Sequence, residues 1–125
     1  MRDREYLNAV TERVIGSAME VSNVLGVGFL EKVYENALVL ELQRNEIPCK
    51  RQVSIRVAYK GSTAGEYIID LLVDQRIIVE LKAVRLLDDV HAAQCLNYLK
   101  ATGYPLCLLI NFGRPRLEIR RLVLD

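Results

Sequence analysis

The first part of the chain carries hydrophobic residues at helical spacing. Over residues 4–25 an apolar side chain recurs every three or four positions, which predicts a helix with one apolar stripe. Gly26 and Gly28 should end this helix, because glycine readily takes the left-handed conformation found at helix C-termini. Similar spacing predicts a second helix over residues 29–45, closed by Pro48. The stripe residues are Leu7, Val10, Val14, Ala18, Val21 and Leu25 in the first helix, and Leu30, Val33, Ala37 and Leu38 in the second.

Beyond Pro48 the hydrophobic period changes from helical to extended. Residues 52–59 alternate apolar and polar side chains, which predicts a half-buried strand. Residues 60–65 have the composition of a turn. Residues 67–73 and 77–84 are almost continuously apolar. Both are therefore expected to be central strands that are covered on both faces.

The last third of the chain predicts one helix and two strands. The helix is expected over residues 88–102, with Asp88 or Asp89 as its N-cap and Gly103 as its stop. The resulting element order is ααβββαββ, which predicts an α/β (α+β) fold in which helices pack on a mixed β-sheet. The two final strands are expected over residues 106–111 and 117–124.

Composition places the chain among globular proteins. Its 125 residues, of which 51% are hydrophobic and 26% charged, suit one domain with one core, spanning residues 1–125. No apolar run reaches the ~18 residues that a membrane span needs, and the charged N-terminus lacks the apolar stretch of a signal peptide. Cys49, Cys95 and Cys107 are odd in number and form no CxxC pair. We therefore expect reduced thiols, a cytoplasmic protein and no structural zinc site.

Net charge gives no general indication of nucleic-acid binding, since it is only +1. Such binding would have to rest on local basic clusters. These clusters are either phosphate contacts or solvated strand faces that nearby acids balance, and the sequence leaves both interpretations open. The candidates are Lys50, Arg51, Arg56 and Lys60 around the first strand, and Arg114, Arg116, Arg120 and Arg121 near the C-terminus.

Three charged residues interrupt the most apolar strands. Asp70 lies in the first of them; Glu80 and Lys82 lie two residues apart in the second and therefore share a face. A three-residue loop over residues 74–76 would place Asp70 opposite Glu80, with Cβ atoms ~5 Å apart. A two-residue loop would send these two carboxylates to opposite faces. The convergence of all three charges therefore requires the longer loop or a bulge.

Two interpretations of these charges are open. One is a buried ion pair with no chemistry, because burying an ion costs several kcal/mol unless it is paired or bound to a ligand. The other is a divalent-cation site. Two acids beside one base leave the set short of positive charge, and carboxylate oxygens are good ligands of such ions. We favour the site.

The pattern D-x9-E-x-K, formed by Asp70, Glu80 and Lys82, resembles the PD-(D/E)XK nuclease superfamily, although Ile69 stands where that name has proline. Other segments resemble a small bacterial family of that superfamily, the GxxExxY proteins. The resemblance covers nearly the whole chain and implies a restriction-endonuclease-like fold. The matching segments are residues 28–34 for GxxExxY, 94–98 for QxxxY and 108–113 for the closing strand.

The resemblance also implies roles for individual residues. Asp70 and Glu80 would hold Mg²⁺ or Mn²⁺, together with the carbonyl of Leu81 and the carboxylate of Glu31. Lys82 would position or activate the attacking water and stabilise developing negative charge. The catalytic set is then Asp70, Glu80 and Lys82. Without the resemblance, Glu31 is an acid that the helix dipole favours in a first turn.

Three further residues are candidates for site support or nucleic-acid contact. Gln94 and Tyr98 are spaced to share a helix face. Gln94 would orient the lysine or a phosphate, or else lie on an ordinary surface. Tyr98 and Tyr34 would either flank the site or belong to the core.

The sequence thus predicts a metal-dependent nuclease that hydrolyses phosphodiester bonds of DNA, with RNA as the alternative substrate. The other hypothesis is a catalytically silent nuclease-fold module that binds nucleic acid or protein. The intact acid–acid–lysine set favours the enzyme. We expect no membrane partner, and a homodimer or a protein partner stays open.

Overall fold

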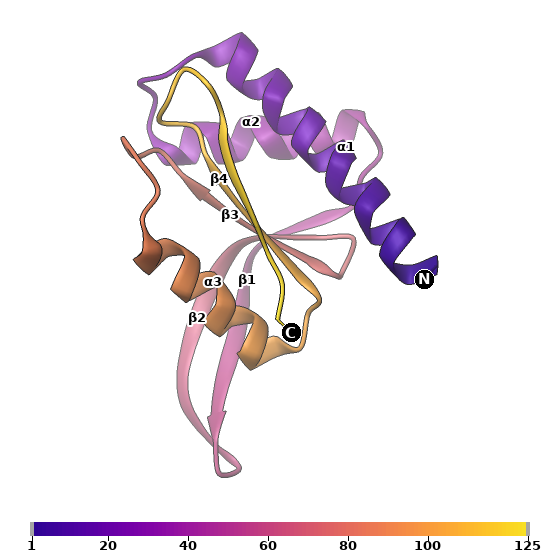
Figure 1. Ribbon diagram of the computed structural model, residues 1–125, viewed down its shortest axis with the longest axis vertical. Coiled ribbons are helices and arrows are strands. Elements are labelled where there is room, and N and C mark those ends of the chain that lie inside the picture. Colours follow the sequence, from indigo (N-terminus) through magenta and orange to yellow (C-terminus); the bar gives the residue numbers. More distant parts are fainter. Residues whose placement is uncertain (1, 125) are drawn as a thin grey trace.

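A computed structural model describes residues 2–124 and has the expected order ααβββαββ (Figure 1). The elements are α1 Arg2–Leu25, α2 Glu31–Arg44, β1 Cys49–Tyr59, β2 Ser62–Val73, β3 Ile77–Lys82, α3 Asp89–Thr102, β4 Leu106–Asn111 and β5 Glu118–Leu122. In this part of the chain the strands form one five-stranded sheet in the order β1-β2-β3-β4-β5. The sheet is mixed, because β3 and β4 pair in parallel whereas the other neighbours pair antiparallel.

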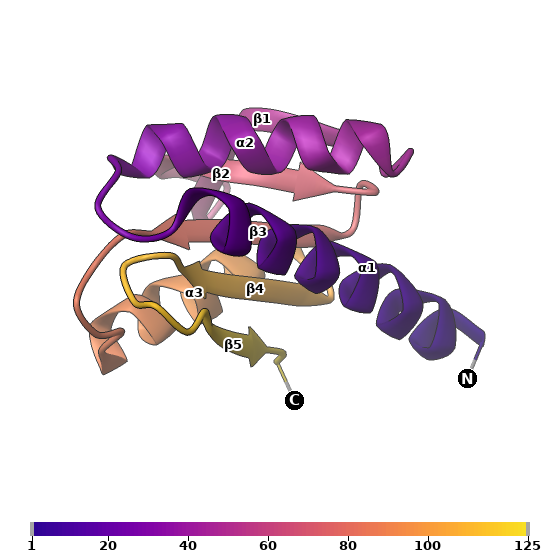
Figure 2. The ribbon, with the colours of Figure 1, turned by 90° about the horizontal axis from the view of Figure 1, so that it is seen from above.

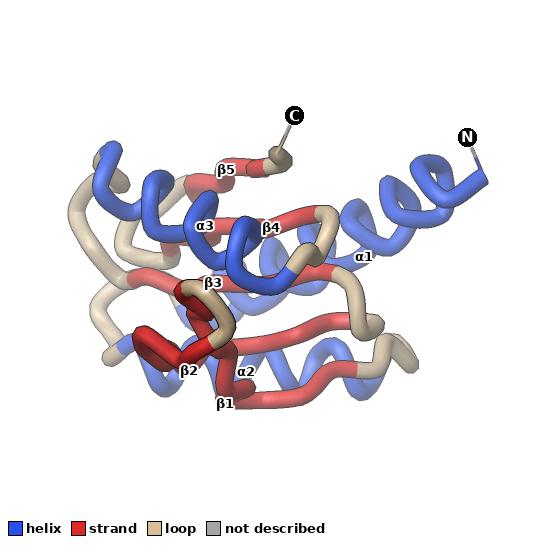
Figure 3. Tube along the Cα trace, turned by 90° about the horizontal axis from the view of Figure 1, so that it is seen from below, coloured by secondary structure: helices blue, strands red, loops and turns tan. Residues whose placement is uncertain are grey.

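Helices cover both faces of the sheet. Figures 2 and 3 show α1 and α2 on one face and α3 on the other. Alternation along β3 sends Ile77, Val79 and Leu81 into the core beneath α1 and α2. Ile78 packs in the core beneath α3. Glu80 and Lys82 lie an even number of positions after Ile78, so their side chains are on the face that α3 covers.

The apolar stripe predicted along α1 is confirmed, because Val10, Val14, Ala18 and Val21 are buried. The stripe predicted along α2 is partly wrong. Leu30 is 79% exposed, since it precedes the helix as its extended N-cap residue. The buried side of α2 consists of Tyr34, Glu35, Leu38, Val39 and Leu42. None of the helices described combines the length and the hydrophobicity of a membrane span.

The hairpin formed by β1 and β2 is longer than predicted. β1 begins at Cys49, three residues before the predicted start, and β2 begins at Ser62. The turn predicted over residues 60–65 is therefore wrong. It consists of Lys60 and Gly61, whose φ angles of 50° and 84° suit a two-residue hairpin connection. Such a turn matches the twist of the strands, so pairing continues through polar residues that looked like a loop.

The side chains of this hairpin change faces partway along its length. Near the sheet centre, Cys49 and Leu71 pack toward α1 and α2, whereas Val53 and Ile69 pack toward α3. Regular alternation would keep residues an even number of positions apart on one face. The change in β1 occurs at Gln52, whose φ is 51°. The outer half of the hairpin runs beside α3 (Figure 1) and is largely exposed, so the prediction that β2 is covered on both faces is wrong for that half.

β3 ends at Lys82, two residues before the predicted end, because a buried asparagine binds the chain that follows. The side-chain oxygen of Asn111 accepts hydrogen bonds from the amides of Val84 and Gly113, both at 2.9 Å. Its amide group donates to the Val84 carbonyl at 2.9 Å and to Glu118 Oε1 at 3.1 Å. A fully bonded buried side chain holds its partners in one arrangement. Asn111 therefore fixes the end of β3, where Lys82 lies.

The predicted ends of α3 are confirmed. Asp88 is the N-cap, and its carboxylate accepts a hydrogen bond from the Val90 amide at 2.9 Å. Gly103, with φ 78°, is the left-handed residue that stops the helix. β4 spans the predicted residues, whereas β5 is shorter than the predicted range 117–124.

Gly113→Ala should destabilise this fold. A Cβ atom at this position would lie 2.1 Å from the backbone oxygen of Val84, so the chain after β3 would have to move. We expect a loss of about 1–3 kcal/mol in the free energy of unfolding, measured by urea denaturation. Gly16→Ala is the matched control. Outside its chain neighbours and the backbone of its own helix, no heavy atom would lie within 4 Å of its Cβ, and alanine in place of glycine inside a helix should add about 0.5–1 kcal/mol. Equal stability of G113A and wild type would contradict this packing.

Candidate active site

Asp70 and Glu80 are joined across β2 and β3. The predicted loop over residues 74–76 is confirmed by the register of the two strands. Beyond the last backbone pair, side chains replace carbonyls as acceptors. The Asp70 amide donates to Glu80 Oε1 at 3.0 Å, and the Leu81 amide donates to Asp70 Oδ2 at 2.8 Å. The two acids therefore meet, as strand parity predicted. We call this arrangement of Asp70, Glu80 and the Leu81 amide the carboxylate clasp.

Burial controls the charge of the clasp. Glu80 is 7% exposed, and burial, followed by the nearby Asp70 carboxylate, raises its pKa to about 9. Burial also raises the pKa of Asp70. Two carboxyl groups this close and this poorly hydrated resist ionising together. Full ionisation of the pair therefore needs a compensating positive charge.

Lys82 and Glu31 complete the charged group around the clasp. Lys82 is half-buried, and its ammonium lowers the pKa of both clasp carboxyls by less than burial raises them. Glu31 is the first residue of α2. Its partial desolvation, followed by the Asp70 charge, raises its pKa, whereas Lys82 lowers it. Within residues 2–124, no carboxylate lies at salt-bridge distance from the Lys82 ammonium. That ammonium is therefore available to a ligand.

The clasp offers two carboxylates to a metal ion. Among the residues that the structure describes, no three His, Cys, Asp or Glu side chains lie close enough to hold an ion by themselves. The clasp leaves Asp70 Oδ1 and Glu80 Oε2 without a backbone hydrogen bond. Mg²⁺ commonly takes one or two carboxylates and completes its shell with water and substrate phosphate, so this donor set fits such an ion. The contributions of Glu31 and of the Leu81 carbonyl stay predictions.

Tyr34 belongs to the core and holds the loop that precedes Glu31. Its side chain is fully buried, and its ring stacks on Phe112 with centroids 4.8 Å apart. Its hydroxyl donates to the Gly26 carbonyl at 2.6 Å and accepts from the Phe29 amide at 3.3 Å. Tyr34 therefore ties the loop between α1 and α2 to the core, and this loop leads directly into Glu31.

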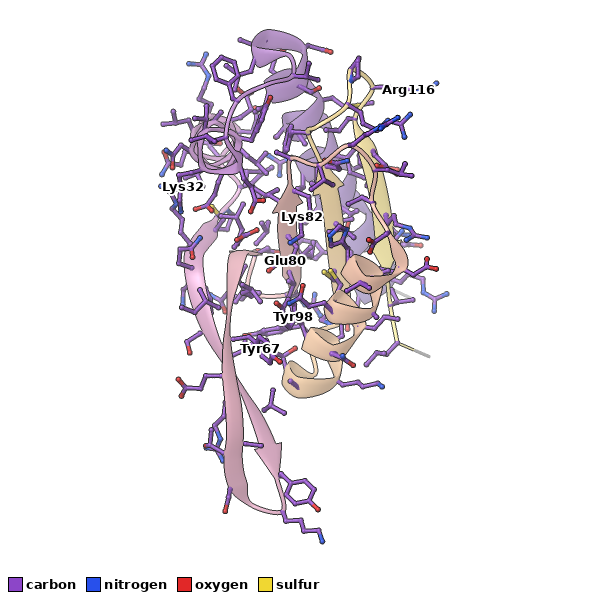
Figure 4. All side chains as sticks on the ribbon, turned by 90° about the vertical axis from the view of Figure 1, so that its left-hand side faces the viewer. Lys32, Tyr67, Glu80, Lys82, Tyr98 and Arg116 are labelled. Atoms are coloured by element: carbon purple, nitrogen blue, oxygen red, sulfur yellow. The ribbon has the colours of Figure 1, made fainter. Side chains whose placement is uncertain are left out.

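Tyr98 and Gln94 line a groove between the outer half of the β1–β2 hairpin and α3. The groove has a volume of about 290 Å³. Tyr98 is buried, and its ring centroid lies 5.6 Å from that of Tyr67. In Figure 4 the two rings follow Glu80 on the side away from Lys82. Burial, followed by the charge of Glu80, raises the pKa of Tyr98. The groove therefore opens beside the clasp.

Sequence reasoning missed two residues next to this site, Glu35 and Gln52. Glu35 lies on α2 one turn after Glu31 and is 4% exposed. It accepts hydrogen bonds from Arg51 and Gln52 of β1. The available signal was an acid inside the apolar side of a helix, but the pattern named no partner for it. Arg51, a candidate phosphate contact, is engaged by Glu35 instead.

The C-terminal basic cluster lies on the surface, and all four of its arginines are exposed. Arg120 lies 3.9 Å from Asp89, and Arg121 donates a hydrogen bond to Asn8. Figure 4 shows Arg116 at the periphery of the molecule, away from Glu80. Two of the four arginines thus have partners within the protein.

Within residues 2–124 the sheet is mixed and five-stranded, with two helices on one face, one on the other and a D…ExK set on its middle strands. This arrangement is that of the restriction-endonuclease-like class of folds. A family profile described as the PD-(D/E)XK nuclease superfamily matches residues 8–122, and the chain belongs to this superfamily.

Solved structures agree with this assignment at the level of the fold. The crystal structure of SSO0001 is similar, with a TM-score of 0.58 and 19% sequence identity over 99% of this chain. The chain spans 63% of the length of SSO0001, and likeness at this identity shows a shared fold. No curated protein matches the sequence.

Glu80→Gln should remove a pH dependence of stability. A carboxyl with a pKa of about 9 in the folded chain keeps a proton that the unfolded chain, with its ordinary pKa of 4.5, has already lost. The metal-free wild type should therefore lose stability as the pH rises from about 4.5 to about 9, and the variant should lose much less. Thermal melts across this range test the prediction, with Glu66→Gln as an exposed control. If E80Q melted far below wild type at every pH, Glu80 would instead be a structural ion-pair partner.

Proposed function

We propose that this chain is a metal-dependent nuclease that hydrolyses phosphodiester bonds, with DNA as its substrate in preference to RNA. The observation that carries the proposal is the carboxylate clasp beside Lys82. A structural ion pair would join the lysine to an acid, whereas here both acids bond to backbone amides and the ammonium has no carboxylate at salt-bridge distance within residues 2–124. The superfamily supplies the class of reaction.

Mg²⁺ or Mn²⁺ is the cofactor that suits these groups. Bound at Asp70 and Glu80, with the Leu81 carbonyl and Glu31 as candidate further ligands, it would lower the pKa of a coordinated water and neutralise charge on the phosphate. The chain keeps its two clasp acids in place through backbone amides. Ligands held this way need little reorganisation when an ion binds.

Lys82 is the residue that we assign to the attacking water and the phosphate. A compact ammonium on a flexible stem can hold the water oxygen and stabilise the negative charge that grows on the phosphate oxygens. Its half-buried position weakens screening by solvent, which strengthens this effect. We assign Gln94, in the groove along α3, to nucleic-acid contact, Tyr98 to support of the site beside Glu80, and Tyr34 to support of the loop before Glu31.

Within the superfamily we propose membership of the GxxExxY group, which the spacing of Gly28, Glu31 and Tyr34 supports. The chain carries little free positive charge near the clasp. Its net charge is +1, and Arg51 is paired with Glu35 at 2.9 Å. Nucleic-acid affinity depends strongly on the number of phosphates that a protein neutralises. We therefore propose that a second copy or a protein partner adds basic surface.

Cleavage should depend on a divalent ion and on Lys82. A panel of DNA and RNA substrates, incubated with Mg²⁺, Mn²⁺ or a chelator, should be cut only with the ions. Lys82→Ala should lower the rate by about 10²–10³-fold, as expected when one group that stabilises transition-state charge is removed. Lys82→Arg should restore activity only in part, because a planar guanidinium does not replace a point charge. Lys100→Ala, at an exposed position on α3, is the matched control.

Two outcomes of this experiment would change the assignment. Wild-type rates in the Lys82→Ala preparation would assign the cleavage to a contaminant or to another site. Binding of nucleic acid without cleavage under every condition would favour the catalytically silent binding module.

A divalent ion should also stabilise the folded chain. Binding to the folded state alone gives ~2.7 kcal/mol at a hundredfold excess over the dissociation constant. Asp70→Asn should abolish this gain and leave the metal-free chain at least as stable as wild type. The variant removes a repelled charge and keeps an oxygen for the Leu81 amide. Thermal melts with and without Mg²⁺ or Mn²⁺ measure both effects. A wild type that responds to neither ion would argue against a metal site at the clasp.

A further inference from the structure

Glu35 is a buried carboxylate that the proposed chemistry does not use. It lies one turn after Glu31 on the same face of α2 and is 4% exposed. Its Oε1 accepts from Gln52 Nε2 at 2.9 Å, and its Oε2 accepts from Arg51 Nε and Nη2 at 3.2 and 2.9 Å. The Lys32 ammonium lies 3.3 and 3.2 Å from the two oxygens. Both oxygens are therefore engaged, by donors from α2 and from β1.

The donors from β1 break the rule of strand alternation. Arg51 and Gln52 are consecutive in the strand, and consecutive side chains normally point to opposite faces. Here both reach the same carboxylate. The φ of 51° at Gln52 makes this geometry accessible, and this is a conformation that residues with a side chain rarely adopt. In this conformation the side-chain amide of Gln52 donates to Glu35.

The point at which side-chain alternation is interrupted in β1 lies opposite Asp70 of β2. The pairs on either side are Arg51 with Leu71 and Val53 with Ile69, in one unbroken register. Between these two pairs, the odd-numbered side chains of both strands change from the face covered by α1 and α2 to the face covered by α3. Asp70 is the β2 residue at the exchange, and its carboxylate leaves the hairpin to accept from the Leu81 amide of β3. The conformation of Gln52 and the direction of Asp70 therefore belong to one local twist of the hairpin.

We infer that Glu35 is a positioning residue for the proposed nuclease site, an inference that rests on the function proposed above. Through Gln52 it holds the twist that aims Asp70 at β3 and at the bound cation. Arg51 and Lys32 neutralise Glu35, which lets a buried charge serve this purpose. In the wild type Glu35 thereby links α2, which carries Glu31, to the part of β1 that lies beside Asp70 of β2.

A glycine at position 52 tests whether Glu35 acts through the φ of Gln52 or has a purely structural or electrostatic role. Glycine takes a positive φ without strain and should therefore not need Glu35. The full-length variants are Glu35→Leu, which has no acceptor for the Gln52 side-chain amide, Gln52→Ala, Gln52→Gly and the double variant with Glu35→Leu and Gln52→Gly. Two measurements are made on each. Amide hydrogen exchange of Leu81, followed by NMR, reports the clasp, and isothermal titration with Mn²⁺ reports ligand geometry.

The two variants that lose the twist should loosen the clasp. In Glu35→Leu and Gln52→Ala, the Leu81 amide should exchange at least about tenfold faster and Mn²⁺ affinity should fall about 10–100-fold, as is typical for groups that orient metal ligands. Gln52→Gly and the double variant should stay within about threefold of wild type, since a threefold change is well below that range. Gln75→Ala is the control for strain alone, because Gln75 has a similar φ of 59° in the loop after β2.

Other outcomes would overturn the inference. If Glu35→Leu and Gln52→Ala lower the melting temperature but leave Leu81 exchange and Mn²⁺ affinity unchanged, Glu35 is structural. If the double variant is not rescued, Glu35 acts by its charge and not through the twist. If Glu35→Leu does not fold, the comparison of Gln52→Ala with Gln52→Gly decides alone, and equal loss in both contradicts the proposal. If wild type does not bind Mn²⁺ but Leu81 amide exchange changes across the variants as expected, the proposed nuclease function is contradicted and the positioning of Asp70 is supported.

Discussion

Two backbone amides, those of Asp70 and Leu81, donate hydrogen bonds to carboxylates instead of carbonyls, and the site depends on this exchange. It occurs where the regular pairing of β2 and β3 ends. Without the facing acid, each amide would lose its acceptor in a partly buried place, at a cost of about 1–3 kcal/mol. The acids are therefore held by the fold itself. Each is positioned with one oxygen that accepts no backbone hydrogen bond.

The same hydrogen bonds also hold two like charges close together. The clasp keeps two acids side by side where burial raises the pKa of both. Lys82 offsets part of the cost of ionising them, and a divalent cation would offset much of the rest. The metal-free chain is thus stabilised by hydrogen bonds and destabilised by charge at the same two residues. A cation that offset the charge repulsion without disturbing the hydrogen bonds would find the two carboxylates already in position.

Three buried polar side chains connect this centre to the surrounding elements. Tyr34 ties the loop before α2 to the core, and Asn111 ties the end of β3 to the end of β4. Glu35 ties α2 to β1 at the level of Asp70. Each has its polar atoms bonded, and fully bonded buried groups favour one conformation over its alternatives. These contacts surround the place where charged residues from α2, β2 and β3 gather.

The sequence by itself determined the order of the elements and the face of most strand residues, because helical period and strand alternation are local properties. Parity and a three-residue loop were enough to place Asp70 against Glu80. Only the tertiary structure decided that Tyr34 serves the core, that Glu35 is buried against β1, and that Gln52 takes a left-handed φ. These features depend on contacts between segments far apart in the chain; Glu35 and Gln52 are 17 residues apart. A local pattern shows that a buried acid needs a partner, but the partner is chosen by the packing of a helix on a strand.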